Sequence, residues 1–193
     1  MTESLIERYQ RTIFRIVLHS PSPENGETKS IKTRKWEEAL RIYAHGVALD
    51  AEERIVVLIQ AHGQKLRPLF ITEYTGYFKA AQGVIPFMML LDKEDILIFA
   101  WYSDNVAEPI CTLKVVDVLS RYAPDIGNIQ KSHSSFSASY LEGMAAIWID
   151  DLIRRWKPET PPALDLIEAI GLLPLLKDGT TQSDVEIRLD ILH

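Results

Sequence analysis

Two polar residues, Gln60 and His62, follow an apolar run and lie two positions apart. In an extended chain such side chains point to the same side, so an amide and an imidazole would face one space. His45 and Asp50, on the preceding stretch, bring a second imidazole and a carboxylate, groups that suit Zn²⁺ and related metals. No third ligand clearly joins the two histidines. Histidines satisfied by ordinary packing are therefore the favoured interpretation, and a transition-metal site is the alternative.

The run that must position these side chains is Ile55 to Ile59, which is rich in β-branched residues. It is too short to span a membrane and too uniformly apolar for a strand that faces solvent. It therefore predicts a central strand buried on both faces. Val47 to Asp50 is typical of the end of another strand, and Ala51 to Glu53 supplies a polar turn between the two.

The stretch Tyr43 to Gly63, YAHGVALDAEERIVVLIQAHG, resembles the core of the PD-(D/E)XK restriction-endonuclease family. It is most similar to stand-alone relatives of the type I restriction enzyme R-subunit N-terminal domain. Glu108 to Cys111 and Ile170 to Ser183 resemble uncharacterised bacterial proteins, cyanobacterial ones among them, in which this core recurs. The resemblance covers Ser30 to Trp101. It implies an α/β fold, with a restriction-endonuclease-like mixed sheet flanked by helices and a helical C-terminal extension.

The resemblance also implies where a catalytic centre would lie. In that family an Asp and a Glu-x-Lys hold a divalent cation that activates water. The Asp falls at or beside His45, the Glu at Gln60 and the Lys at His62. None of the three is the residue that the chemistry needs. We therefore expect no catalytic residues, no metal and no cofactor, with His45, Asp50, Gln60 and His62 as degenerate site positions. The alternative is a Mg²⁺-dependent nuclease acting on DNA through an atypical His/Gln/His site.

Composition narrows the classes of protein that this chain can represent. Its 193 residues, 47% hydrophobic and 25% charged, are typical of one globular domain. A net charge of −6 argues against a broad surface for nucleic acid, although Lys29 to Lys35 form one basic cluster. We expect neither a signal peptide nor a transmembrane helix. The single cysteine, Cys111, favours a small packing residue in a reducing cytoplasm.

The remaining pattern divides the single domain, 1–193, into a nuclease-like core, 1–102, and a mainly helical extension, 103–193. Residues 27–49 fit either a helix or strands, with a first strand near 28–33 if the resemblance holds. Asn128 to Ser135 is expected to be a loop. The other expected elements are helices near 2–17, 74–83, 113–122, 137–156 and 164–170, and a hairpin of strands 87–91 and 96–102.

A leucine-rich segment follows the last expected helix, and Pro174 keeps it from forming a regular helix. Its leucines either pack into their own domain, which is the first interpretation, or contact another subunit. The candidate partner-binding residues are Leu172, Leu173, Leu175 and Leu176. Together with the degenerate site, this predicts a protein-interaction, regulatory or assembly module. Its partner would be another protein or a second copy of the chain, with nucleic acid less favoured and no membrane contact.

Overall fold

The computed structural model describes residues 40–81, 83–131 and 137–189. The expected helix at 2–17, the strand at 28–33 and the basic cluster at 29–35 lie outside the described residues. Within the described ranges, six strands form one sheet in the order β5-β4-β3-β2-β1-β6. The elements in chain order are β1 (Leu40–Leu49), β2 (Ile55–Ala61), α2 (Pro68–Ala80), β3 (Phe87–Leu91), β4 (Asp95–Ala100), β5 (Cys111–Lys114), α3 (Val115–Leu119), α4 (Ile126–Lys131), α5 (Ala138–Arg154), α6 (Leu164–Ala169), the 3-10 turn η1 (Leu173–Leu176) and β6 (Thr180–Leu189).

The predicted central strand is confirmed as β2, in the interior of the sheet. It pairs antiparallel with β1, Gly46 opposite Ile59, and parallel with β3, Val57 opposite Phe87. Helix α2 makes the connection that a parallel pair requires. Every residue of β2 is buried, as the uniformly apolar run predicted. The sheet is mixed, because the other neighbouring strands pair antiparallel.

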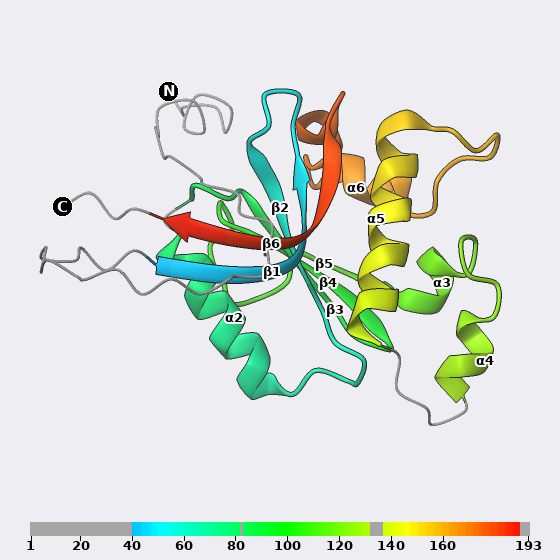
Figure 1. Ribbon diagram of the computed structural model, residues 1–193, viewed down its shortest axis with the longest axis horizontal. Coiled ribbons are helices and arrows are strands. Elements are labelled where there is room, and N and C mark those ends of the chain that lie inside the picture. The colour runs from blue at the N-terminus through cyan, green and yellow to red at the C-terminus, as the bar shows by residue number, and fades with distance from the viewer. Residues whose placement is uncertain (1–39, 82, 132–136, 190–193) are drawn as a thin grey trace, which may run out of the picture.

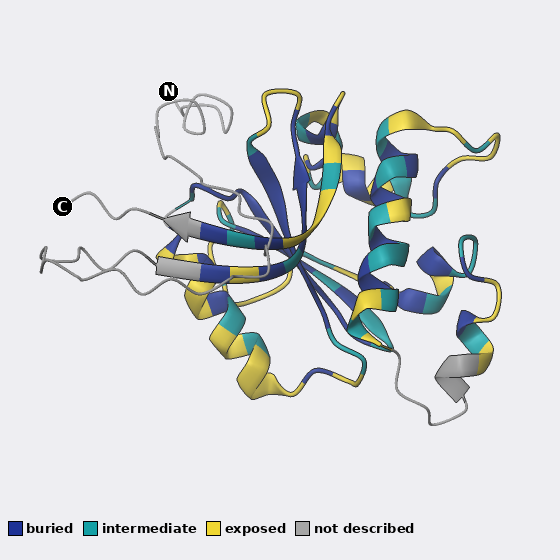
Figure 2. Ribbon diagram, viewed as in Figure 1, coloured by how far each residue is buried: buried dark blue, intermediate teal, exposed yellow. Residues whose placement is uncertain are grey.

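Helices cover both faces of the sheet (Figure 1). On one face, Phe78 of α2 packs on a cluster that includes Leu58, Met88 and Phe99. On the other face, α3, α5, α6 and η1 enclose a second apolar cluster centred on Trp148. Figure 2 shows the central strands as a buried band between these layers. No helix in the described ranges is long and apolar enough to cross a membrane.

Helix α5 is the longest described helix, as its apolar stripe predicted. Ser137 caps it, since the Ser137 hydroxyl accepts a hydrogen bond from the Tyr140 N–H at 3.1 Å. The helix ends at Arg154, and the next residue, Arg155, adopts the left-handed conformation with φ 49°. Trp148 is fully buried, whereas Trp156 lies beyond the helix end and is 51% exposed. The expectation that Trp156 continues the apolar stripe is therefore wrong, because the chain leaves the helix one residue earlier.

Three expectations for the second half of the chain need correction. Cys111–Lys114 is an edge strand rather than the start of a helix, and α3 begins only at Val115. The expected loop near 128–135 begins inside α4, which extends to Lys131. The polar residues after η1 enter β6, which pairs with β1 along its whole length. The extension therefore contributes two strands to the sheet and is less helical than expected.

The contested stretch 27–49 is a strand over Leu40–Leu49, the part that the structure describes. The hairpin is confirmed by the antiparallel pairing of β3 and β4, Phe87 opposite Ala100. The short helix before Gly171 is also confirmed, and Gly171 ends it with a positive φ of 74°.

Replacement of Trp148 by Ala should lower the free energy of unfolding by about 3–5 kcal/mol, because the indole is fully buried between α5 and the sheet. Its ring N–H also donates to the Pro162 carbonyl at 3.0 Å. Trp156→Ala is the matched control, with an expected change within about 0.5 kcal/mol. Urea unfolding measures both. Equal losses in the two variants would contradict the burial described here.

Candidate functional site

The structure brings three of the four candidate site residues together. His45 lies on β1 opposite Gln60, since the neighbouring pair is Gly46 and Ile59. Gln60 is the sixth residue of β2, and His62 directly follows the strand, held by its N–H to the Leu91 carbonyl at 2.8 Å. The His45 and His62 rings are 6.3 Å apart, centroid to centroid. The side chains of His45, Gln60 and His62 therefore lie close together.

Asp50 does not belong to this group, although the sequence analysis counted it among the site positions. It follows the C-terminal end of β1, five residues or roughly 16 Å along an extended chain from His45. Its carboxylate accepts the N–H of Glu52 at 3.0 Å and that of Arg54 at 2.8 Å, and pairs with Arg54 Nε at 2.7 Å. Asp50 thus holds the β1–β2 turn. Among the described residues, no three His, Cys, Asp or Glu side chains gather as ligands for a metal.

The side chain of Gln60 makes hydrogen bonds at both ends. Its amide nitrogen donates to the Tyr43 carbonyl, and its Oε1 lies 2.6 Å from His45 Nδ1. Because the NH₂ group must face the Tyr43 carbonyl, Oε1 faces the imidazole, so His45 must donate from Nδ1. In the other tautomer, His45 Nδ1 would accept the Ala61 N–H at 3.3 Å. Its lone pair would then face the lone pairs of Gln60 Oε1 at 2.6 Å, which is repulsive.

This arrangement removes Gln60 as a ready metal ligand. The residue is only 3% exposed, and its carbonyl oxygen already accepts the His45 proton. A cation there would compete with the His45 N–H for this oxygen, and the neutral amide offers it no charge. The arrangement can orient side chains and hold β1 to β2.

His62 lies in an aromatic setting. Its ring centroid is 6.0 Å from that of Phe70, nearly parallel, and 5.4 Å from that of Tyr74. Burial lowers the pKa of His62 below its ordinary value, repulsion from His45 lowers it further, and attraction to Asp92 opposes both. Its Nε2 is buried without a hydrogen-bond partner in the described part of the chain. A neutral imidazole packed on aromatic rings is a poor substitute for a lysine ammonium.

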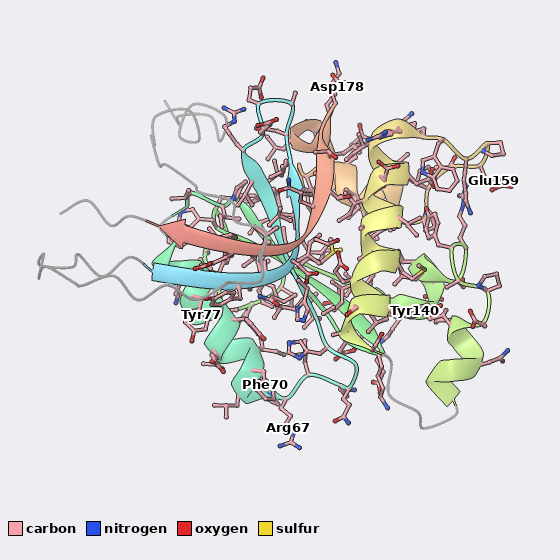
Figure 3. The ribbon with its side chains drawn as sticks, viewed as in Figure 1. Arg67, Phe70, Tyr77, Tyr140, Glu159 and Asp178 are labelled. Carbon is pink, nitrogen blue, oxygen red and sulfur yellow. The ribbon has the colours of Figure 1, made fainter. Side chains whose placement is uncertain are left out.

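A cavity of about 530 Å³ opens beside His62, between the end of β2 and the first turn of α2. Its basic lining residues are Lys65 and Arg67. Lys65 forms an ion pair with Glu94 at 2.5 Å. Figure 3 shows Arg67 pointing outward below α2. The cavity is lined by His62, Gly63, Gln64, Lys65, Leu66, Arg67 and Phe70.

Asp92 fixes the loop around this cavity, a role that the sequence did not reveal. Its Oδ2 accepts the Leu66 N–H at 2.8 Å, and its Oδ1 accepts the N–H groups of Glu94 at 2.7 Å and Asp95 at 2.8 Å. The sequence showed only an acidic turn between two strands. An Asp at the start of a tight turn is the signal that could have indicated the bonds within the turn, because its side chain mimics a backbone acceptor.

The four candidate partner-binding leucines do not act as one surface. Leu172 and Leu176 are buried, so the partner-binding assignment is wrong for these two. Leu173 and Leu175 are half-buried and pack against the same cluster as α5. Pro174 lies in the short turn η1, and the first and last of the four leucines, Leu172 and Leu176, point inward.

Comparison of the chain with family models, with curated proteins and with solved structures finds no match. The similarity to the PD-(D/E)XK family accordingly stays a prediction. The geometry adds one observation that bears on it, because the three positions matched to the family's acid, acid and lysine lie together where the end of β2 faces the middle of β1.

Stability should depend on pH through His62, whose pKa is lower in the folded state than its ordinary value of 6.5. The unfolded chain binds the proton first, so the free energy of unfolding falls as pH drops below about 6.5 towards the lowered folded pKa. His62→Gln should show a shallower loss over this window. Urea unfolding of both proteins at several pH values measures the difference, and identical slopes would contradict the assignment.

Proposed function

We propose that this chain is a nuclease-like domain without hydrolytic activity, which acts as a protein-interaction, regulatory or assembly module. The observation that supports it is the hydrogen-bond chain from His45 through Gln60 to the Tyr43 carbonyl. It occupies the position where a nuclease of the resembled family needs open carboxylates.

The chemistry argues in the same direction. Mg²⁺ is a hard cation that is held mainly through anionic oxygens, and an amide brings no charge. Gln60 is in addition bonded at both ends, and His62 is held neutral by burial. The group lacks both the negative charge for the metal and the positive charge for the phosphate. Binding to another protein needs neither.

A metal-dependent nuclease acting on DNA is the second candidate, and the basic lining of the cavity beside His62 favours it. Phosphates are commonly bound by Lys and Arg. Lys65, however, is already paired with Glu94, which leaves Arg67 as the more available charge. The net charge of −6 also opposes a broad nucleic-acid surface.

A cytoplasmic setting belongs to the same proposal. The single cysteine of the chain, Cys111, is half-buried on the edge strand β5. Burial raises the pKa of its thiol, which keeps the thiol protonated and unreactive. A reducing compartment suits a protein whose cysteine packs rather than pairs.

The protein should leave plasmid, linear and single-stranded DNA intact in Mg²⁺ and in Mn²⁺, because no open anionic ligand set is formed by His45, Gln60 and His62. Gel electrophoresis after prolonged incubation measures this. A Gln60→Ala, His62→Ala variant is the control for contaminating nucleases. Cleavage by the native chain that disappears in this variant would favour the second candidate.

The resemblance itself is tested by rebuilding the family's residues as His45→Asp, Gln60→Glu and His62→Lys. Two carboxylates would then face each other where His45 and Gln60 now meet at 2.6 Å. A bound cation at 100 times its dissociation constant adds about 2.7 kcal/mol, which raises the melting temperature by several degrees. Mn²⁺ should therefore stabilise the rebuilt variant and not the native chain.

Circular dichroism establishes that the rebuilt variant is folded before the metal is added. A second variant with only His62→Lys keeps the His45–Gln60 bond and serves as the matched control. If the rebuilt variant folds but its melting temperature does not change when Mn²⁺ is added, the match of these positions to the family is contradicted.

A further inference from the structure

An apolar groove of about 240 Å³ lies between the last turn of α5 and η1. Leu152 and Ile153 line it from α5, and Leu173 and Pro174 line it from η1. Leu152 is buried, whereas Ile153 and Leu173 are half-buried, so part of this apolar lining stays in contact with solvent. Pockets for drug-sized ligands measure about 300–1,000 Å³. This groove is smaller and suits a single aliphatic side chain.

Two basic residues, Arg155 and Lys177, complete the lining, one next to each wall of the groove. Both are exposed, and neither forms an ion pair within the described ranges. Asp178, although next to Lys177 in the chain, lies at the outer tip of the turn into β6 (Figure 3). The neighbouring Arg154, by contrast, pairs with Asp150 at 2.8 Å. On a chain of net charge −6, two cations at one apolar groove suit carboxylates from outside.

The backbone at Arg155 favours glycine rather than arginine. The residue follows α5 with φ 49°, in the left-handed region where helices commonly place a glycine because a Cβ is strained there. Its guanidinium makes no hydrogen bond or ion pair with the part of the chain that the structure describes. An arginine held in a strained position without an internal partner indicates a role for its side chain outside the fold.

The partial negative charge at the end of α5 does not cancel this positive rim. A helix end carries about half a unit of charge, whereas Arg155 and Lys177 together carry two positive charges. The complementary ligand therefore has carboxylates on both sides of an aliphatic side chain. In an extended chain, side chains two positions apart face the same side and lie about 7 Å apart. Acidic residues two positions before and two after the aliphatic residue meet this requirement.

We propose that the groove binds an extended acidic segment of another protein. An aliphatic side chain of that segment enters between α5 and η1, and its flanking carboxylates pair with Arg155 and Lys177. The apolar contact supplies the affinity. The exposed ion pairs, each worth at most about fivefold in affinity, select a partner of negative charge. The inference rests on the proposed function, for which it states the chemistry of the partner.

Nuclear magnetic resonance of the ¹⁵N-labelled chain, titrated with synthetic peptides, tests the proposal. The probe peptide is Gly-Glu-Ser-Leu-Ser-Glu-Gly. Matched peptides replace the leucine by serine, both glutamates by glutamine, or both glutamates by lysine. The probe should bind with a millimolar or smaller dissociation constant and shift the amide signals of Ile153, Arg155, Leu173 and Lys177. Each matched peptide should bind at least about fivefold more weakly, and added salt should weaken the probe.

Substitutions in the chain separate charge from folding. Arg155→Gly should weaken the probe about fivefold without lowering the melting temperature, because glycine suits the left-handed backbone. Arg155→Glu with Lys177→Glu should reverse the preference, so that the lysine peptide binds better than the probe. Lys79→Glu is the matched control for Lys177→Glu alone, since Lys79 is an exposed cation on α2, which covers the other face of the sheet. It should leave binding unchanged.

Signals that do not shift at several millimolar probe, or that shift only away from the groove, overturn the inference. So does a reversed variant that still prefers the glutamate peptide, or a serine peptide that binds as well as the probe. A dimer in sedimentation velocity that the reversed charges dissociate would instead assign the groove to a second copy of the chain.

The nuclease assay is independent of these outcomes. A chain that leaves DNA intact and binds no probe contradicts only this inference. A chain that cuts DNA and binds the probe contradicts only the proposed function.

Discussion

Strand β2 is buried along its whole length, so any polar side chain on it must find its hydrogen bonds inside the protein. Gln60 is the polar side chain on that strand. Its bonds to the Tyr43 carbonyl and to His45 satisfy both ends of the amide and bind β2 to β1 through side chains as well as backbone. Because Gln60 must form its hydrogen bonds inside the sheet, these bonds determine its role. The amide oxygen that would bind a metal is already engaged with His45.

Asp151 imposes a similar constraint on the other face of the sheet. This carboxylate is fully buried near the C-terminal end of α5, where the helix dipole disfavours a negative charge. It accepts the Tyr122 hydroxyl at 2.6 Å and the Lys157 N–H at 3.2 Å. Burial and the bond to Asp151 raise the pKa of Tyr122. These bonds turn the chain back after the helix, next to the left-handed Arg155.

Much of the fold could be predicted from the sequence, because the central elements have a strong pattern. The run in β2 is buried at every residue, and the stripe on α5 buries Leu141, Ala145, Trp148 and Leu152. Strand β5 escaped prediction because only Leu113 of its four residues is buried. Strand β6 escaped because its first half is polar and because Asp184 interrupts it with a positive φ of 52°. Edge elements with few buried residues give only a weak hydrophobic pattern in the sequence.

The candidate site was predicted in part for the same reason. Strand geometry is enough to place Gln60 and His62 on one side, and an antiparallel neighbour brings His45 opposite. The orientation of the Gln60 amide depends on the Tyr43 carbonyl, a backbone group whose position follows only from the assembled sheet. Asp50 was included for its carboxylate, but five residues of extended strand hold it roughly 16 Å from His45.

The pairing of β6 with β1 also sets the order in which the chain can mature during synthesis. Leu40 lies opposite Leu189, and Leu49 lies opposite Thr180. The ribosome therefore makes the partner of β1 some 140 residues after β1 itself, which takes on the order of ten seconds. Until then β1 is an open, largely apolar edge that other nascent chains can pair with. Gly179 lets β6 enter, since a Cβ there would lie 2.0 Å from the Leu49 carbonyl oxygen. The edge of β1 is thus protected from aggregation only after β6 has been synthesised.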